Sequence, residues 1–483
     1  MNATAARGTA VLALSRGCYF ILGYLAVVLL ARELGPAIYG TYGVIISVLV
    51  WLEESGRYAI PSATAKLLAE ITTGHAELER NALTLNLGLH VLFFVLLWVA
   101  APGLASWFGI ANGTLLFRLA ALDLPCFGAY TAYQAIHQGY YHFFRLGLSQ
   151  VIYALAKLIG VLLLIHFGVS LERALLVNAA ATVIGLMVLL PGTSLQWKGC
   201  WLERVAPLVS VAVPMGLYFF PLMLRSSLLL GTLRIMSPVS EEVWIGILVA
   251  ALNVARVPAF TLATVTIVLL PSLSRALARH DVALAKRYIN QALRFFFILY
   301  LPVSFVLMAQ PEQLMQWIYS QEFAGGGLLL SILVVGEGMH TLQAILGSVL
   351  NAAGEARKAA AVTILSLIPS LAMLVIFIHF LGVIGAALSS ALMPLFGVVI
   401  FSGAIWQRFG TLLKKRSLCN IGLAGSLMFL VDALFPEADG FFILLHTIGL
   451  VVYVASLVVL GEITRQDVAS FLPWQRIQRQ AVT

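Results

Sequence analysis

Charged side chains are scarce in this sequence. Asp, Glu, Lys and Arg make up 10% of the 483 residues, whereas hydrophobic residues make up 61% and the mean hydropathy is +0.98. Soluble domains carry about 25% charged residues. The shortage of charge therefore excludes a soluble globular protein, and it predicts a chain that crosses a membrane many times.

Cysteines and long polar segments are also few. The four cysteines show no CxxC spacing and no nearby His, so neither a metal site nor a disulfide framework is expected, and no cofactor is implied. No predicted loop exceeds about 20 residues, against a typical median of about 4–6. Enzymes that work in membranes usually place their chemistry on large loops. A polysaccharide polymerase or ligase is therefore a less favoured alternative.

Acidic residues are outnumbered, 21 against 29 basic ones, and the net charge is +8. The Lys and Arg residues gather in the predicted loops on the side of the N-terminus, about 19 against about 4 on the other side. This asymmetry predicts that both termini are cytoplasmic. It also explains the basic pI by a membrane surface, so the expected partner is membrane lipid and not nucleic acid.

Long apolar segments dominate what is present. A window of about 19 residues finds about 14 segments long enough to span a bilayer. Motifs in the first part of the chain recur about 200–215 residues later, which indicates an internal duplication. The recurring pairs are Arg32 and Pro36 with Arg234 and Pro238, Pro61-Ser62 with Pro271-Ser272, Gln134-Ala135-Ile136 with Gln343-Ala344-Ile345, and Ile165-His166-Phe167 with Ile378-His379-Phe380.

The duplication predicts the architecture. We expect an all-α integral membrane protein with two lobes of about six helices each, related by a pseudo-two-fold axis along the membrane normal. The predicted boundaries are residues 1–203 for the first lobe and 204–410 for the second. Two further helices and a cytoplasmic tail occupy residues 411–483. Two similar lobes with short loops favour a transporter whose path lies near mid-membrane.

The segment 29–70 shows where charge enters the apolar interior. Gly35-Pro36 predicts a turn between two helices. Glu53, Glu54 and Arg57 then interrupt the second apolar run. Ionisable groups at this depth cost a few kcal/mol each unless they are paired or face water. Glu53 and Arg57 are four residues apart on one helix, so a simple ion pair between them is the favoured interpretation of Glu53.

Three motifs carry a resemblance to a known family: LLARELGPAIYGTYG at 29–43, IVLLPSLSRALARHD at 267–281 and SVLNAAGEARKAA at 348–360. They resemble the polysaccharide transporters, or oligosaccharide flippases of the O-antigen type, in the multidrug/oligosaccharidyl-lipid/polysaccharide exporter (MOP) superfamily. The resemblance implies a flippase that moves polyprenyl-diphosphate-linked oligosaccharide across the bacterial inner membrane by alternating access. It further implies a role in surface polysaccharide or exopolysaccharide assembly, with a polysaccharide polymerase as a partner.

Buried cations are the candidate diphosphate ligands. Relatives that flip a peptidoglycan precursor grip the diphosphate with arginines, and the resemblance suggests this role for Arg16, Arg57 and Arg256. Lys157 and Arg225 add to the positive charge. An alternative for Arg16 and Arg57 is snorkelling to the membrane interface. The alternative for Lys157, Arg225 and Arg256 is a structural pair with a nearby acid.

Acids and aromatic residues complete the set of candidates. Glu53, Glu54, Asp123 and Glu337 are candidates for carrying coupling protons, and Glu337, with His340 one turn on, is favoured among them. Tyr130, Tyr133, Gln134 and Gln138 form a polar-aromatic face that would stack sugar rings, although helix packing explains it nearly as well. A cation-coupled multidrug exporter of the same superfamily stays as the alternative function. No catalytic residue is expected.

Overall fold

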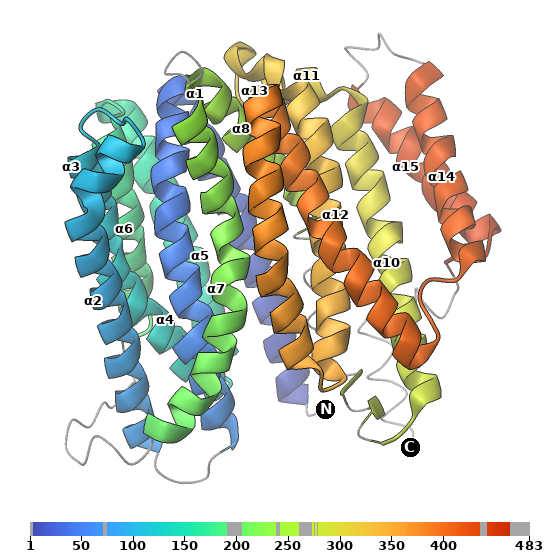
Figure 1. Ribbon diagram of the computed structural model, residues 1–483, viewed down its shortest axis with the longest axis horizontal. Helices are drawn as coiled ribbons and strands as arrows, with labels where there is room; N and C mark the ends of the chain where they lie inside the picture. Colours follow the sequence, from blue (N-terminus) through green and yellow to red (C-terminus); the bar gives the residue numbers. More distant parts are fainter. Residues whose placement is uncertain are drawn as a thin grey trace. The chain divides into compact units, whose positions relative to one another are not determined.

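The computed structural model describes residues 3–70, 75–190, 205–237, 242–259, 273–274, 276–277, 279–434 and 442–463. Most of these residues are helical, and no strand occurs among them. The long helices are α1 (Ala3–Glu70), α2 (His75–Trp107), α3 (Gly113–Ala121), α4 (Asp123–Gly139), α5 (Phe143–Phe167), α6 (Leu171–Met187), α7 (Val205–Met236), α8 (Glu242–Ala255), α10 (Val282–Ala309), α11 (Pro311–Ile318), α12 (Gly327–Ala352), α13 (Ala356–Phe409), α14 (Lys415–Leu434) and α15 (Phe442–Val459) (Figure 1).

The chain divides into two compact units. Unit 1 contains Met1–Ala250, Met315–Gly325 and Thr363–Ala386, and unit 2 contains Ala251–Leu314, Gly326–Val362 and Ala387–Thr483. Eight helical segments in the described part of the chain are long and apolar enough to cross a membrane. The all-α membrane fold expected from composition is therefore confirmed. The boundaries at 203 and 410 stay predictions.

The predicted turn lies in the middle of α1. Gly35 breaks the helix with φ 69° and ψ 166°, a conformation that only glycine adopts without strain, and Pro36 restarts the helix. Each half of α1 is long enough to cross a bilayer, since about 20 residues suffice. A second break of this kind, at Gly382, divides α13.

In unit 1, α1 packs against α4, α5 and α7 (Figure 1). Its second half approaches α8 at two glycines. A Cβ on Gly246 would lie 1.8 Å from the Pro36 carbonyl oxygen, and one on Gly40 would lie 2.8 Å from the Gly246 nitrogen. The two backbones are in direct contact, as in small-residue packing between membrane helices.

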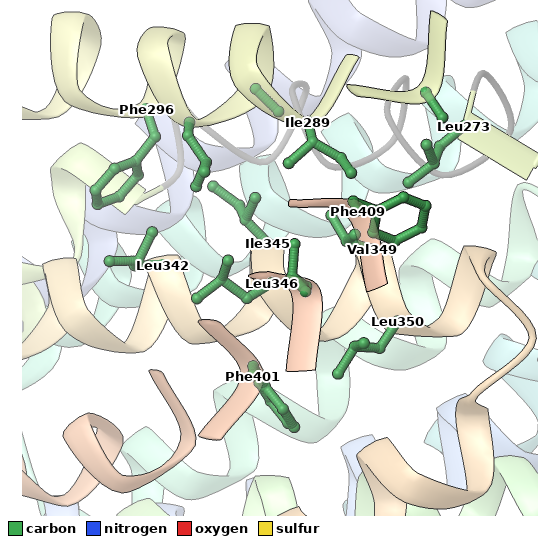
Figure 2. Packing of buried hydrophobic residues seen from close by; sticks show 14 of the residues in the cluster. Leu273, Ile289, Phe296, Leu342, Ile345, Leu346, Val349, Leu350, Phe401 and Phe409 are labelled. Atoms are coloured by element: carbon green, nitrogen blue, oxygen red, sulfur yellow. The ribbon is translucent and has the colours of Figure 1, made fainter. Parts of the chain in front are cut away.

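Unit 2 has its own apolar core (Figure 2). Ile289 and Phe296 of α10 face Leu342, Ile345 and Val349 of α12, which recur at helical spacing, and Phe401 and Phe409 of α13 join the same cluster. At the end of unit 2, α14 and α15 lie side by side (Figure 1). Tyr453 of α15 donates a hydrogen bond to the Ile298 carbonyl of α10, which anchors this last pair of helices.

Two arginines that the repeat pairs with each other make the same kind of contact. Arg32 donates to the Trp317 and Ile318 carbonyls at the end of α11, with its Nε 2.8 Å from the second. Arg234 donates to the Phe108 and Gly109 carbonyls just beyond α2, at 2.9 and 3.2 Å. Both side chains satisfy carbonyl groups that a helix end leaves open. This equivalence supports the duplication.

Other repeat pairs also occupy matching environments. Gln134 and Gln343 are each 9% exposed. His166 packs edge-on against Phe167, and His379 packs in the same way against Phe380. Pro238, Pro271 and Ser272 lie outside the described residues.

The ends of α13 meet within unit 2. Glu355, just before the helix, forms ion pairs with Arg408 in its last turn and with Lys358 at 3.2 Å. These contacts, chiefly the hydrogen bond from Arg408, lower the pKa of Glu355 from its ordinary value. The contact requires the two halves of α13 to run back along each other from Gly382. It therefore confirms that α13 is a hairpin of two spans.

Candidate functional site

Arg57 is paired with Glu54 and not with Glu53. Its Nη1 lies 2.9 Å from Glu54 Oε1, and its guanidinium lies over the Phe127 ring at 5.0 Å. The expected ion pair between Glu53 and Arg57 is wrong for a geometric reason. Both acids lie one helical turn before Arg57, and the Glu53 carboxyl is directed to Asp123 instead. Arg57 keeps 31% of its side chain exposed.

Arg16 lies on the first half of α1 and Arg57 on the second, and the two have Tyr58 as a common electrostatic neighbour. Both guanidinium groups act electrostatically on the Tyr58 phenol, and Arg57 acts on Tyr19 as well. Arg16 is exposed. Tyr58 is held in place by stacking on Phe219 at 4.2 Å. We call Arg16 and Arg57 the α1 arginine pair. They present two planar, permanently charged groups around Tyr58, a chemistry suited to a polyanion.

A second group of polar residues is buried deeper in unit 1. Glu53 is 6% exposed and Asp123 is 1% exposed, and their carboxyl groups lie within hydrogen-bonding reach of each other. We call Glu53 and Asp123 the buried carboxyl pair. Asn178 Nδ2 donates to Asp123 Oδ2 at 2.7 Å, and Lys157 Nζ donates to Asn178 Oδ1 at 2.7 Å. The chain Lys157–Asn178–Asp123–Glu53 thus joins α5, α6, α4 and α1.

The remaining cations are placed as follows. In unit 2, Arg256 Nε lies 3.6 Å from Glu337 Oε1. Glu337, the acid favoured for proton coupling, is therefore the ion-pair partner of Arg256, a candidate diphosphate ligand. Arg225 is half-buried on α7. Lys157 is linked to Asp123 through the Asn178 side chain. The alternative of structural pairing therefore has geometric support for Arg256 and Lys157.

The predicted sugar face is mostly packed inside unit 1. Tyr130 and Tyr133 belong to a buried cluster with Phe127 and Ile136, and Gln134 is 9% exposed. Only Gln138 of the four is exposed. Tyr130 also stacks on Tyr153 at 5.8 Å. This packing supports the helix-packing alternative. The exposed aromatic residue near the α1 arginine pair is Tyr19, at 38%.

Sequence reasoning did not find Asn178 and Thr182. They lie one turn apart on α6, and the Thr182 hydroxyl donates to the Asn178 carbonyl at 3.2 Å. Asn178 is the residue that links the buried lysine to the buried carboxyl pair. An Asn within an otherwise apolar span was the available signal, because an amide in hydrocarbon needs a partner.

Comparison with known proteins decides the family. The model of the lipid II flippase MurJ family matches residues 64–456, which is most of the chain. The chain belongs to the lipid II flippase MurJ family. It is therefore a membrane transporter and not an enzyme, and the family places it among flippases of lipid-linked substrates. No protein among the curated sequences matches this chain.

Solved structures of the MOP superfamily share the fold. The inward closed conformation of the lipid II flippase MurJ aligns with a TM-score of 0.77 at 14% identity, covering 93% of this chain and 98% of that one. An inward-facing MATE family multidrug resistance transporter gives 0.70 at 16% identity, covering 81% and 95%. A MOP superfamily transporter from Pyrococcus furiosus gives 0.58 at 16% identity, covering 84% and 96%. At these identities the likeness shows the fold alone.

These findings refine the resemblance seen in the motifs. The predicted superfamily is confirmed. The predicted polysaccharide-transporter branch is not, because the matching family is a different branch of the same superfamily. Since MATE exporters share the fold, the fold does not separate a flippase from a drug exporter. That distinction depends on the charged residues.

Proposed function

We propose that this MurJ-family protein flips a polyprenyl-diphosphate-linked saccharide, and that the α1 arginine pair binds the diphosphate. The observation that carries the proposal is that Arg16 and Arg57, from the two halves of α1, both act electrostatically on the Tyr58 phenol. A diphosphate presents several anionic oxygens, and two planar guanidinium groups bind them in pairs at any physiological pH. A cationic drug would be repelled by the same groups.

Glu54 gives Arg57 a partner when no substrate is bound. The 2.9 Å contact compensates the guanidinium inside the membrane-spanning helix, where an isolated charge is costly. A diphosphate would compete with Glu54 for Arg57, so binding exchanges one ion pair for another. In unit 2, Arg256 and Glu337 form a comparable couple at 3.6 Å. We assign Arg256 an anion-binding role within unit 2, independent of the α1 arginine pair of unit 1.

The proposal specifies the lipid carrier of the cargo and leaves two candidates for the saccharide. Lipid II and the lipid-linked oligosaccharides of surface polysaccharides share the polyprenyl diphosphate, and the family favours the first, whereas the motifs at 29–43, 267–281 and 348–360 favour the second. The positive-inside asymmetry supports an inner-membrane protein with both termini in the cytoplasm. In the oligosaccharide case, a polysaccharide polymerase would take up the product.

The binding test uses purified full-length protein and farnesyl diphosphate, a short polyprenyl diphosphate. Arg57→Ala is expected to weaken binding about tenfold to a hundredfold, because a hydrogen bond to a charged group contributes about 1.5–3 kcal/mol. Arg57→Lys should lose a large part of that affinity, since an ammonium lacks the planar fork. Arg256→Ala should also weaken binding. The matched control is Arg287→Ala, which removes an exposed arginine of α10. Equal affinities in wild type, Arg57→Ala and Arg256→Ala would refute the assignment.

The substrate is then separated by two genetic readouts. Rescue of a strain depleted of its own lipid II flippase would identify lipid II as the cargo. Loss of surface polysaccharide on deletion of this gene, without a defect in peptidoglycan, would identify a lipid-linked oligosaccharide. Drug resistance conferred by the gene, with neither of the other two effects, would show the multidrug exporter alternative to be correct.

A further inference from the structure

The buried carboxyl pair has no role in the proposed binding of the diphosphate. Both side chains lie in unit 1 and are at least nine-tenths buried. Glu53 Oε1 and Asp123 Oδ1 each receive no hydrogen bond from any residue that the structure describes. Buried polar atoms are nearly always hydrogen-bonded, so two adjacent oxygens without a donor require an explanation.

The neighbouring donors are already in use. Asn178 Nδ2 is directed at the other Asp123 oxygen, Oδ2, at 2.7 Å. The Thr182 hydroxyl has a single hydrogen atom, for which the Asn178 carbonyl and Asp123 compete, so it does not serve both open oxygens. The Lys157 ammonium donates to Asn178 Oδ1. A single hydrogen atom between the two carboxyl groups would satisfy both open oxygens, because a protonated carboxyl donates and a carboxylate accepts.

The local charge favours the same conclusion. The charges that act on Glu53 come from Asp123, Glu54 and Lys157. Glu54 is compensated by Arg57. Two carboxylates against one ammonium leave one negative charge, which is costly in a buried site. Binding of one proton makes the cluster neutral.

The other titratable groups around the pair do not replace this proton. Glu53 and Asp123 act electrostatically on Tyr42 of α1 and on Tyr153 of α5. A phenol is neutral near pH 7, so neither tyrosine changes the charge of the cluster. On α2, His90 Nδ1 lies 2.8 Å from the Asn86 carbonyl and donates to it, because that oxygen only accepts. On α7, Arg225 lies between Phe220 and Ser227, whose backbone and side chain contact Trp51 and Ser47 of α1.

We infer that Glu53 and Asp123 together form a binding site for one proton inside the membrane-spanning part of unit 1. Lys157 compensates one of the two negative charges, and Asn178 links Lys157 to Asp123, so that one proton makes the cluster neutral. A small metal cation fits the site less well. The oxygens that remain open are those of Glu53, Asp123 and Thr182, fewer than the six to eight that a hard cation such as Ca²⁺ takes. The site is separate from the α1 arginine pair, so it stands whether or not the diphosphate assignment holds.

The charge count makes the site testable by substitution. Glu53→Gln and Asp123→Asn each leave one carboxylate facing Lys157, so the bound proton should be lost in both variants. Lys157→Met removes the compensating charge, so both carboxyl groups should then be protonated. A merely structural hydrogen-bond network does not predict that removing a lysine adds a proton.

Infrared spectroscopy of the purified full-length protein in lipid nanodiscs measures protonated carboxyl groups directly. At pH 7 we expect a protonated-carboxyl stretch in wild type that shifts in D₂O. This signal should disappear in Glu53→Gln and in Asp123→Asn, and it should roughly double in Lys157→Met. Glu33→Gln is the matched control, since Glu33 is an exposed acid on the same helix, α1, and its substitution should change nothing.

Two outcomes would overturn the inference. The first is a wild-type spectrum at pH 7 without any protonated carboxyl group, which decides the question even if a variant fails to fold. The second is an unchanged signal in both Glu53→Gln and Asp123→Asn, once helical circular dichroism has shown that these variants are folded. Farnesyl diphosphate binding is measured in parallel, so failure of the proton site and failure of the diphosphate site are separate results.

Discussion

At the scale of single residues, Arg32 and Arg234 both donate hydrogen bonds to carbonyl groups at a helix end, but Arg32 is exposed and Arg234 is buried. Arg234 is 7% exposed and serves two carbonyl groups and Glu242, whose Oε1 lies 2.5 Å from Nη2. Arg32 serves two carbonyl groups from an exposed position. Water replaces a lost donor at an exposed site but not at a buried one.

We therefore expect unequal effects on stability. Arg234→Ala should lower the free energy of unfolding by about 2–4 kcal/mol, because it leaves buried carbonyls and a carboxylate without a donor. Arg32→Ala should lower it by about 1 kcal/mol. Thermal and denaturant unfolding in detergent, followed by circular dichroism, measures both variants. A larger loss for Arg32→Ala than for Arg234→Ala would contradict this reading of their burial.

Single residues also show the limit of sequence reasoning. The sequence revealed that Glu53, Glu54 and Arg57 place charge inside an apolar helix, because type and position are enough for that. It did not reveal which acid pairs with Arg57, since both acids are within reach on the helix and Asp123 of α4 takes Glu53. The roles of Asn178 and of the Arg256–Glu337 contact required the fold, because their partners lie 21 or more residues away in the chain.

At the scale of helices, the positions of glycines separate packing from lipid exposure. Gly246 of α8 faces the backbone of α1, where a Cβ would lie 1.8 Å from the Pro36 oxygen. Gly88 of α2 is exposed, and a Cβ there would meet nothing within 4 Å. The same substitution should therefore have opposite effects at the two sites.

Gly246→Ala is expected to lower the free energy of unfolding by about 1–3 kcal/mol, the usual range for overpacking. Gly88→Ala should raise it by about 0.5–1 kcal/mol, because alanine is the better helix former. Unfolding of the two variants and wild type in one detergent gives the comparison. Similar effects at both sites would show that α1 and α8 are not in backbone contact. The sequence predicted the helix break at Gly35 but not this contact, because small residues at a helix interface look the same as small residues facing lipid.

At the scale of the whole molecule, composition alone was sufficient for the fold class. The apolar content of 61% and the scarcity of charge leave only a helical membrane protein, and the repeat motifs pointed to a transporter. The branch of the superfamily was not readable from motifs, because the same apolar helices serve several cargoes. The charged groups that distinguish these cargoes are few, and their meaning depends on which of them meet in space.

The two proposed sites of unit 1 should influence each other, because Glu53 and Arg57 lie four residues apart on α1. A diphosphate on Arg57 adds negative charge beside the buried carboxyl pair and so favours its proton. By reciprocity the bound proton favours the diphosphate. Affinity for farnesyl diphosphate should then fall as pH rises and the pair loses its proton.

Titration calorimetry between pH 6 and pH 9 measures this linkage, with Glu53→Gln as the reference. This variant has no shared proton to lose, so its remaining pH dependence reports the ionisation of the ligand itself. We expect a steeper loss of affinity with pH in wild type than in Glu53→Gln, and the wild-type slope in Glu33→Gln. Coupling between sites in proteins is typically about 5-fold to 150-fold, which is well within the range of the measurement. Identical slopes in wild type and Glu53→Gln would mean that the two sites, though one helical turn apart, bind their ligands independently.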